Sequence, residues 1–569
     1  MFFVALATDY DGTLALQGHV DAPTRAALDA VRRSGRKLIL VTGRDLPDLR
    51  RVFDEMELFD MVVAENGGLL LDPATREEIV LTDPPPVALI KRLRERGVQP
   101  LSVGRTIIAT REPNEGIVLE AIRSLNLEQH IVFNKGAVMI LPTSVNKASG
   151  LKHALARLNL SPQNVVGVGD AENDIAFLGV CGCAVAVNNA LPTVKAKADF
   201  VVADHGAGIV ELASLLTVND LASARPRVPR ALPVLGAKQN GESVTISPFE
   251  TVLVTGSSGG GKSTIVTALL EQMRELTYQF CVIDPEGDYG DLRDTVMVGD
   301  AKRPPQIREV VDLLAKPDTS VVINLLAVDP SERPRYLANL LPDLGKLRRT
   351  TGRPHWIVID EVHHCLPAKW DPAPLSLPRE LPAAIAVTVH PQEVASDLLA
   401  LVSVVVGVGA GAQGAIEKFC DAMGRSRPMA LEQPLEGSVL VLRRDRDTEL
   451  VTPRMPKEKQ KRHVRKYSEG DLGADSSFYF RGPERALNLR AQNLVSFLQL
   501  AAGVDDKTWL YHLRDGGYSR WFRGAIKDED LAREAAAVEG DGSLSAPDSR
   551  ARMKELVERR YTAPAKSGG

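Results

Sequence analysis

Short apolar runs alternate with amphipathic segments along the first 216 residues of the chain. The runs have the length of buried strands, and the segment 24–34 between two of them carries its apolar residues at helical spacing. Strands that alternate with helices form a parallel sheet with helices packed on its faces. The pattern therefore predicts an α/β region, whose strands we place at residues 2–8, 37–42, 61–65, 164–169 and 183–187.

One segment of this region breaks the alternation. Residues 81–142 contain three consecutive prolines, Pro84 to Pro86, and lack the regular strand and helix spacing of the sequence on either side. We expect this segment to form a small inserted α/β cap, which would close a substrate pocket. The first domain is therefore assigned to residues 1–216, with its cap at about 81–142.

A second stretch of the same alternation begins at residue 232. Before it, residues 217–231 form a basic, proline-rich linker with little apolar surface to bury. The second domain is assigned to residues 232–466 and is expected to hold a central, mostly parallel sheet. Its strands are placed at residues 251–256, 280–284, 320–326, 356–361, 384–389 and 402–409.

The remaining residues, 467–569, are expected to form a small helical C-terminal module with a tail. Aromatic side chains gathered over a short stretch are typical of a folded core. The basic run 457–466 before the module is expected to be a solvated linker or helix face, and contact with phosphate or DNA is the alternative. The clustered aromatic residues are Trp509, Tyr511, Tyr518, Trp521 and Phe522.

Composition and charge indicate the cellular compartment of the protein, and they say less about its function. With 25% charged residues and a formal net charge of -4, the whole molecule gives no electrostatic sign of nucleic-acid binding. The five cysteines are scattered and odd in number, which favours reduced core thiols over a disulfide framework. No apolar run approaches the ~20 residues that span a bilayer. We therefore expect a cytoplasmic protein with no membrane partner.

The first candidate site follows the first strand, in Asp9-Tyr10-Asp11-Gly12-Thr13. A carboxylate can attack phosphorus as a nucleophile, and a second carboxylate two residues later can protonate the leaving oxygen. Asp9 and Asp11 have this spacing, and Gly12 permits a sharp turn beside them. The pattern predicts phosphoryl transfer through an aspartyl-phosphate.

Later segments supply the other groups that such chemistry requires. Thr42 ends a strand and can donate to a phosphate, while Lys147 can neutralise its charge. Asp170 and Asp174 offer the hard oxygen ligands that Mg²⁺ prefers. Because active-site loops gather at the carboxyl ends of parallel strands, we expect these residues to lie near Asp9.

These motifs resemble those of the haloacid dehalogenase superfamily, in its Cof-like, capped sugar-phosphatase branch. The resemblance covers most of residues 1–216 and also rests on the strings at 186–190 and 195–199. It implies a Rossmann-like fold and a phosphomonoester substrate. The further string Ala64-Glu65-Asn66-Gly67-Gly68 makes Glu65 and Asn66 additional site candidates.

The resemblance also implies a role for each motif residue. Asp9 would be the nucleophile and Asp11 the acid and base, while Thr42 and Lys147 would bind the phosphoryl group. The cap that normally selects the leaving group is short here, so sugar phosphate, nucleotide and nucleic-acid end all stay open as substrates. The implied ligands of Mg²⁺ are Asp9, the Asp11 carbonyl and Asp170, with Asp174 in support.

The second candidate site follows the predicted strand 251–256. The spacing Gly-x4-Gly-Lys-Ser lets backbone N–H groups wrap a phosphate, places Lys262 on the β and γ oxygens of ATP and offers the Ser263 hydroxyl to Mg²⁺. A helical stretch follows the loop, as this motif requires. The predicted nucleotide-binding residues are Gly256, Ser257, Ser258, Gly259, Gly260, Gly261, Lys262, Ser263 and Thr264.

A pair of acids completes this site. Asp360 and Glu361 end an apolar strand, where Asp360 can hold a metal ion and Glu361 can orient or deprotonate water. Adjacent acids in this position favour hydrolysis of ATP over phosphoryl transfer to an alcohol. The next strand ends with Thr388, His390 and Gln392, any of which could sense the γ-phosphate.

The second domain resembles the HerA/FtsK class of P-loop ATPases. The resemblance covers about residues 232–466 and rests on the loop 256–264 and on the strings at 235–246, 282–289 and 358–361. It implies a homo-oligomer, typically a hexamer, that translocates double-stranded DNA and receives an arginine from a neighbouring subunit. Arg443, Arg444 and Arg446 are candidates for that arginine by position alone.

The leading hypothesis is a bifunctional enzyme. It joins an Mg²⁺-dependent phosphomonoester hydrolase to a HerA-like domain that binds and hydrolyses ATP. Two alternatives stay open: a kinase-phosphatase fusion that acts on nucleic-acid ends or small metabolites, and an ATP-gated assembly scaffold that regulates the phosphatase. DNA-stimulated turnover of ATP would favour a motor, whereas nucleotide-dependent assembly with negligible turnover would favour the scaffold.

Overall fold

The computed structural model of the protein describes residues 1–561 except 135, 225–231, 258–259, 291, 370–379, 410, 429–436, 445–446, 458–466, 468–471, 473–476, 485–486 and 527. Residues 225–231 of the predicted linker 217–231, residues 458–466 of the basic run 457–466, and Ser258, Gly259 and Arg446 lie outside the described residues. The chain divides into two compact units. The first is Met1–Ser257, Lys262–Pro285 and Asp294–Met455, and the second is Ser258–Gly261, Glu286–Arg293 and Pro456–Gly569.

An eight-stranded sheet forms the N-terminal part of the first unit, in the order β12-β11-β10-β1-β2-β3-β4-β5. The strands from β12 to β3 are parallel, and β4 and β5 continue the sheet antiparallel. The α/β region predicted from the sequence is confirmed. The strands are β1 (Ala5–Asp9), β2 (Lys37–Val41), β3 (Met61–Ala64), β4 (Leu69–Asp72), β5 (Glu77–Val80), β10 (Val165–Gly169), β11 (Cys183–Val187) and β12 (Phe200–Val202).

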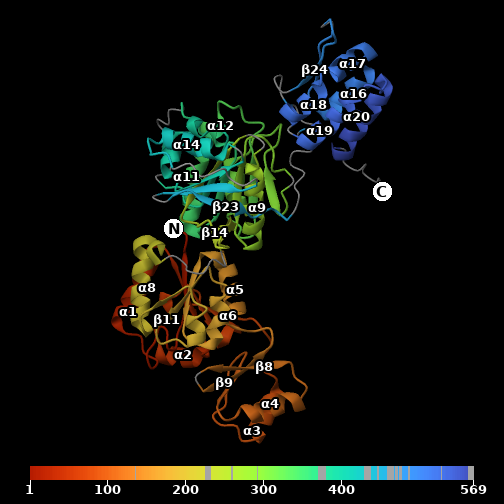
Figure 1. Ribbon diagram of the computed structural model, residues 1–569. Helices are drawn as coiled ribbons and strands as arrows, with labels where there is room; N and C mark the ends of the chain where they lie inside the picture. The colour runs from red at the N-terminus through yellow and green to blue at the C-terminus, as the bar shows by residue number, and fades with distance from the viewer. Residues whose placement is uncertain are drawn as a thin grey trace. The chain divides into compact units, whose positions relative to one another are not determined.

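Helices cover both faces of this sheet, with α1 and α8 on one side and α5 and α6 on the other (Figure 1). Helix α1 begins after Asp21, whose carboxylate accepts a hydrogen bond from Thr24 N at 2.9 Å and so caps the helix. Its residues Leu28 and Val31 are buried in the apolar core of this region. The helices are α1 (Ala22–Arg33), α2 (Leu46–Val52), α5 (Lys147–Arg157), α6 (Ile175–Leu178), α7 (Pro192–Lys195) and α8 (His205–Asn219).

The residues between β5 and α5 form a separate antiparallel sheet, in the order β6-β7-β9-β8. One face of this sheet packs on two helices through Leu93, Val118 and Ile140. Met139 and Leu141 lie in a second apolar cluster. The predicted cap falls on this segment. Its elements are α3 (Val87–Glu95), β6 (Ser102–Val103), β7 (Ile108–Arg111), α4 (Glu115–Ser124), β8 (Gln129–Asn134) and β9 (Ala137–Pro142).

An eleven-stranded sheet forms the rest of the first unit, in the order β14-β13-β23-β22-β21-β15-β20-β19-β16-β18-β17. The strands from β21 to β17 are parallel, and the other four are antiparallel additions. The mostly parallel sheet predicted here is confirmed. The strands are β13 (Val234–Ala237), β14 (Ser243–Thr245), β15 (Thr251–Gly256), β16 (Phe280–Asp284), β17 (Thr295–Val298), β18 (Ser320–Asn324), β19 (Trp356–Ile359), β20 (Ala384–Thr388), β21 (Val404–Val408), β22 (Val439–Arg443) and β23 (Glu449–Pro453).

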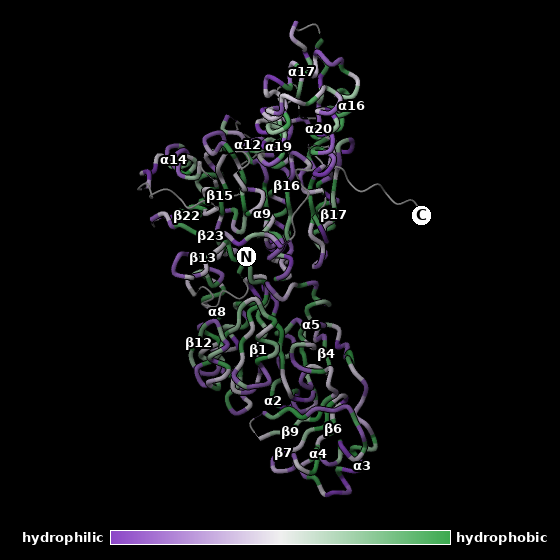
Figure 2. Tube along the Cα trace, turned by 45° about the vertical axis from the view of Figure 1, so that its right-hand side comes forward, coloured by the Kyte–Doolittle hydropathy of each residue, from purple (hydrophilic) through white to green (hydrophobic). Residues whose placement is uncertain are grey.

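The central strands of both sheets are apolar along their length, as the hydropathy colouring shows (Figure 2). Every residue of β1, β10, β15 and β19 is buried. A strand covered on both faces needs apolar side chains on both, which explains continuous runs in place of alternation. The helices of this second sheet are α9 (Lys262–Glu275), α10 (Ile307–Leu314), α11 (Arg333–Thr351), α12 (Val362–Cys365), α13 (Ser396–Leu401) and α14 (Ala412–Ala422).

The second unit is helical in its C-terminal part, as predicted. Phe497, Trp509, Tyr518 and Phe522 are buried in one aromatic core, whereas Tyr511 stays 41% exposed. The Tyr518 hydroxyl donates to Trp509 O at 3.1 Å, which satisfies a polar group inside that core. Its elements are β24 (Phe478–Phe480), β25 (Leu489–Ala491), α16 (Leu494–Gly503), α17 (Asp506–Arg514), α18 (Gly517–Trp521), α19 (Glu529–Gly540) and α20 (Ala546–Tyr561).

All five cysteines are buried, as expected of core thiols. They are Cys181, Cys183, Cys281, Cys365 and Cys420. Within the described part of the chain, no helix combines the length and the apolar character that crossing a membrane requires.

Within the first unit, a buried polar seam joins the two large sheets. We give this name to Asn159, Gln163 and Asn164, which precede β10, and to Arg353 and His355, which precede β19. His355 Nε2 lies 2.9 Å from Asn164 Oδ1, and Arg353 Nη2 donates to Asn159 O at 2.9 Å. Asn164, Arg353 and His355 are all at most 1% exposed. Buried polar groups of this kind require partners, and Asn164, Arg353 and His355 each have one across the seam.

The seam fixes His355 as a neutral ring. Its Nδ1 accepts a hydrogen bond from Gln279 N at 2.8 Å, so Nε2 carries the proton that faces Asn164. Burial, and then the charges of Arg353 and Arg348, lower the pKa of His355 to about 3. A histidine in the unfolded chain takes up a proton near pH 6.5. Protonation therefore favours the unfolded state as pH falls below that value, and the stability is fully present above it.

We expect the substitution His355→Asn to flatten this pH dependence, because asparagine keeps an acceptor for Gln279 N and does not titrate. Between pH 6.5 and 4, the unfolding free energy of the unaltered protein should fall more steeply than that of the variant, by up to about 1.4 kcal/mol per pH unit. Scanning calorimetry across this range measures the difference. Parallel slopes for the two proteins would contradict the assignment of a neutral, buried His355.

Candidate active sites

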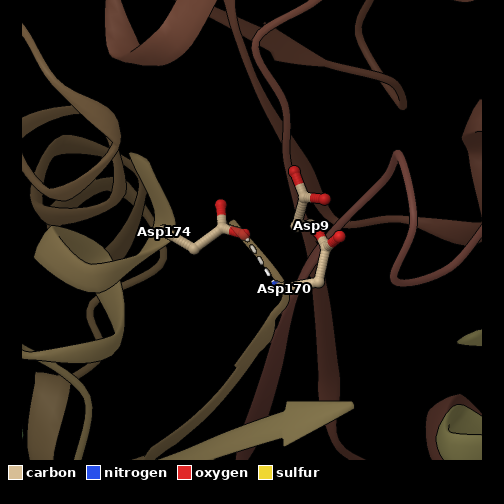
Figure 3. Close-up of side chains that lie close together, drawn as sticks. All are labelled: Asp9, Asp170 and Asp174. Carbon is tan, nitrogen blue, oxygen red and sulfur yellow. Dashed lines mark hydrogen bonds between the residues drawn. The ribbon is translucent and has the colours of Figure 1, made fainter. Parts of the chain in front are cut away.

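Three aspartates meet at the carboxyl edge of the eight-stranded sheet (Figure 3). Asp9 is the last residue of β1, Asp170 follows the neighbouring parallel strand β10, and Asp174 ends a short helical turn after it. One carboxylate oxygen from each lies within 4.8 Å of the others, and all three residues are buried. The structure thus brings together three of the residues predicted to hold a metal ion.

Lys147 enters this cluster from the start of α5. Its Nζ lies 2.5 Å from Asp9 Oδ1 and 2.6 Å from Asp174 Oδ1, and none of its side chain is exposed. Burial opposes the charged ammonium, but Asp174 and Asp9 outweigh it and raise the pKa of Lys147. Burial raises the pKa of Asp9, Asp174 and Asp170 raise it further, and Lys147 acts in the opposite sense.

The cluster fits a hard divalent cation. Three buried carboxylates face one ammonium, so negative charge is in excess in a site shielded from water. Asp174 Oδ2 accepts hydrogen bonds from the backbone N–H groups of Asp170 and Ala171, both at 2.9 Å, which fix its orientation. Thr13 Oγ1 donates to Asp170 Oδ1 at 3.2 Å. Carboxylate oxygens held in this way are the ligands that Mg²⁺ prefers.

Asp11 contacts Arg44, a residue that the sequence analysis did not include in the site. Arg44 grips both oxygens of Asp11 through Nε and Nη2, each at 2.7 Å, and its Nη1 lies 2.5 Å from Asp48. The hydrogen bond to Asp11, against the cost of burial, raises the pKa of Arg44. Thr42, which is 1% exposed just before this loop, accepts a hydrogen bond from Arg44 N at 3.1 Å.

Glu65 connects the large sheet to the inserted segment. Its Oε1 accepts from Arg105 N at 3.0 Å, and its Oε2 accepts from Thr106 N and Thr106 Oγ1, both at 2.7 Å. Asn66 Oδ1 accepts from Asn173 Nδ2 at 3.3 Å, beside the turn that carries Asp174. The structure therefore places Glu65 at the base of the inserted segment and Asn66 next to the carboxylate cluster.

The phosphate-binding loop begins where β15 ends. Gly256 has φ 153°, and a Cβ there would lie 2.1 Å from Val408 O, so only glycine fits this position. Lys262 Nζ donates to Gly256 O at 3.1 Å and to Ser257 O at 2.9 Å, so its ammonium lies at the start of the loop. Ser263 and Thr264 follow in the first turn of α9. Gly260 and Gly261 belong to the second unit.

The acidic pair follows β19, as predicted. Asp360 is 5% exposed, and its N–H donates to Ile283 O at 3.0 Å. Glu361 precedes α12 with a left-handed backbone, φ 38° and ψ 52°. A non-glycine residue in this conformation is uncommon and is stabilised by its surroundings. The arrangement sets the direction in which the Glu361 side chain leaves the end of the strand.

The predicted sensors of the γ-phosphate divide into two groups. Thr388 ends β20 and is fully buried, and its Oγ1 accepts a hydrogen bond from His390 N at 2.9 Å. Gln392 is exposed in a short turn beyond it. A residue that the sequence reading missed, His363, lies with Nδ1 2.9 Å from Thr388 Oγ1. The sequence offered one signal for it, because His363 closely follows the acidic pair Asp360 and Glu361.

The arginine candidates have partners inside the first unit. Arg443 pairs with Glu250 and donates through Nη2 to Thr245 O at 2.6 Å. Arg444 follows directly after β22, and its Nη2 donates to Ala400 O at 3.2 Å. Both arginines thus hold local structure here, and an action in a neighbouring subunit stays a prediction.

Two family models match the chain. The model of haloacid dehalogenase-like hydrolases matches residues 6–97 and 102–211, and that of the central domain of the helicase HerA matches residues 249–351. The chain belongs to the haloacid dehalogenase-like hydrolases, and it carries a P-loop ATPase domain of the HerA type in the same polypeptide. Both resemblances drawn from the sequence are confirmed.

Archaeal phosphatases are among its relatives. The phosphoglycolate phosphatase of Methanothermobacter thermautotrophicus is 31% identical over 222 residues, which cover 36% of this chain and 96% of that protein. The phosphoglycolate phosphatase of Halorubrum lacusprofundi is 31% identical over 210 residues, which cover 35% and 90%. A solved haloacid dehalogenase-like hydrolase from Bacteroides thetaiotaomicron aligns with a TM-score of 0.34 at 17% identity and covers 37% and 98% of the two chains.

We expect Asp11→Asn to lower kcat for an alkyl phosphomonoester by about 10²–10⁴-fold, because an alkoxide needs a proton as it leaves. The loss should be smaller for p-nitrophenyl phosphate, whose leaving group is stable without one. Phosphate release measures both rates. Asp48→Asn is the matched control, since it removes the other carboxylate held by Arg44. Equal losses with the two substrates would count against Asp11 as the acid.

Proposed function

We propose that the first domain hydrolyses phosphomonoesters through an aspartyl-phosphate on Asp9. The observation that carries this proposal is the buried cluster of Asp9, Lys147, Asp170 and Asp174, which combines a nucleophile, a cation and metal ligands. Its match to the haloacid dehalogenase-like hydrolases supports the same chemistry. Mg²⁺, held by Asp9, the Asp11 carbonyl and Asp170 with Asp174 in support, would offset charge on the phosphoryl oxygens.

The reaction has two steps. First, an Asp9 oxygen bonds to phosphorus as the bond from phosphorus to the leaving oxygen breaks, and Asp11 gives that oxygen a proton. Second, water attacks the phosphorus, Asp11 takes the proton from the water, and the bond to Asp9 breaks to release phosphate. Lys147 and Thr42 bind the phosphoryl oxygens throughout. Because Arg44 occupies both oxygens of Asp11, one of these contacts must open before Asp11 can give a proton to the leaving oxygen.

The relatives supply a first substrate to test. Two of them, each covered over at least 90% of its length, are named phosphoglycolate phosphatases. We therefore propose a small phosphorylated carboxylate, with phosphoglycolate as the first example. The inserted segment, which Glu65 ties to the main sheet, is where the leaving group would be selected.

For the second domain we propose hydrolysis of ATP. Lys262 would bind the β and γ phosphates, Ser263 and Asp360 would hold Mg²⁺, and Glu361 would orient the attacking water. The match to the central domain of HerA supports double-stranded DNA as a partner and a homo-oligomer, with six subunits as the first form to test. The order of β15, β20 and β19 in the sheet supports a shared nucleotide edge.

We expect Lys262→Ala to abolish ATP turnover and leave phosphoglycolate hydrolysis intact, and Asp9→Asn to do the reverse. Each substitution removes a group that contacts phosphate in one site only. Both rates are measured for each protein, with and without duplex DNA, at several salt concentrations because contacts to the DNA backbone weaken with salt.

The outcomes separate the open alternatives. Stimulation of ATP turnover by DNA supports a motor. Phosphorylation of a nucleic-acid end or a metabolite that depends on Lys262 would replace the ATPase by a kinase. ATP-dependent assembly with negligible turnover would instead make the second domain a scaffold for the phosphatase. Release of phosphate from ATP that requires Asp9 would contradict the proposed division of labour.

A further inference from the structure

The carboxyl edge of β20 lies between the two halves of the nucleotide site. This strand pairs on one side with β15, which leads to the phosphate-binding loop, and on the other with β19, which leads to the acidic pair. The register sets Thr388 opposite Thr255, the residue before Gly256. The Thr388 side chain therefore lies between the loop expected to bind phosphate and the segment that carries Glu361.

His363 spans the gap between Thr388 and Glu361. Its Nδ1 lies 2.9 Å from Thr388 Oγ1 and 3.5 Å from Glu361 Oε2. The His363 side chain is 8% exposed and that of Glu361 is 23% exposed, so water screens these contacts only partly. One ring nitrogen thus faces both the sensor strand and the carboxylate expected to orient water.

Neighbouring groups hold this ring in place. The centroid of the His390 ring lies 5.5 Å from that of His363 with the planes at 87°. Thr388 Oγ1 also accepts the His390 N–H, so the hydroxyl is held on a second side. The left-handed backbone of Glu361 brings its carboxylate back towards the helix that carries His363. Position and orientation at this contact are therefore constrained from several elements.

We infer that His363 is a positioning residue for ATP hydrolysis, which holds the Glu361 carboxylate in register with Thr388 at the phosphate edge. The inference rests on the proposed ATPase activity and adds to it a residue, His363, that connects Thr388 with Glu361. His363 touches neither substrate nor metal in this role. It acts by setting the direction from which Glu361 meets the attacking water, and a small displacement of such a group is costly for the rate.

The substitutions His363→Phe and Thr388→Val test this role. Phenylalanine keeps the ring and valine keeps the branched shape, while each removes the hydrogen-bonding atom. We expect each to lower kcat for ATP by about 100-fold with little change in KM, because nucleotide binding does not depend on the contact. The double variant should be no slower than the slower single variant, since both break one link.

Conservative variants and a neighbouring histidine provide the controls. His363→Asn, which keeps a polar atom near the Nδ1 position, and Thr388→Ser should recover most of the rate. His364→Phe should match the unaltered enzyme, because His364 is exposed and adjacent to His363 in the same helix. Unchanged phosphoglycolate hydrolysis shows that the eight-stranded sheet is folded in every variant, and an unchanged KM for ATP shows that the nucleotide site is formed.

Two results would overturn the inference. If His363→Phe keeps kcat while Lys262→Ala loses it, ATP is hydrolysed without this contact and His363 is structural. If the losses in His363→Phe and Thr388→Val multiply in the double variant, the two residues act separately. ATP turnover that survives Lys262→Ala would end the proposed ATPase itself, and with it the role of His363.

Discussion

A single buried ammonium holds the catalytic edge of the first sheet together. Lys147 Nζ contacts both Asp9 and Asp174, and without it two carboxylates would face each other in a site shielded from water. Leaving such a charge unpaired costs about 3–5 kcal/mol. Because Lys147 begins α5, directly after the inserted segment, the chain must leave the sheet and return in one register for the cluster to form. The proposed metal and phosphate sites and the placement of the inserted segment all depend on this return.

The two sheets of the first unit are joined by more than the covalent chain. Asn164 and His355 each stand before a central strand, and each strand is followed at its other end by an acid of a candidate site, Asp170 after β10 and Asp360 after β19. Gln163 also donates to Leu276 O at 2.9 Å, just past the helix that begins with Lys262. The scaffold of one active site is therefore packed directly against the scaffold of the other.

Sequence alone predicted the central parallel strands and the acidic clusters because both follow local rules, but it missed strands at the edges of both sheets. Strands buried on both faces are continuous apolar runs, and the ends of parallel strands gather the residues that follow them. The contacts of Arg44 with Asp11 and of His363 with Thr388 were not predicted, since they depend on side-chain geometry between separate segments. The seam was hidden for the same reason: Asn164 and His355 are 191 positions apart, and each resembles an ordinary turn residue.

The seam has a consequence for the life of the protein in a cell. If the chain were cut in the connecting segment and the two pieces came apart, each piece would expose polar groups that had been paired across the seam. Such surfaces attract proteases and chaperones. We therefore expect the two activities to be synthesised, retained and degraded together, at a fixed ratio of one phosphatase to one ATPase, whatever governs the abundance of their substrates.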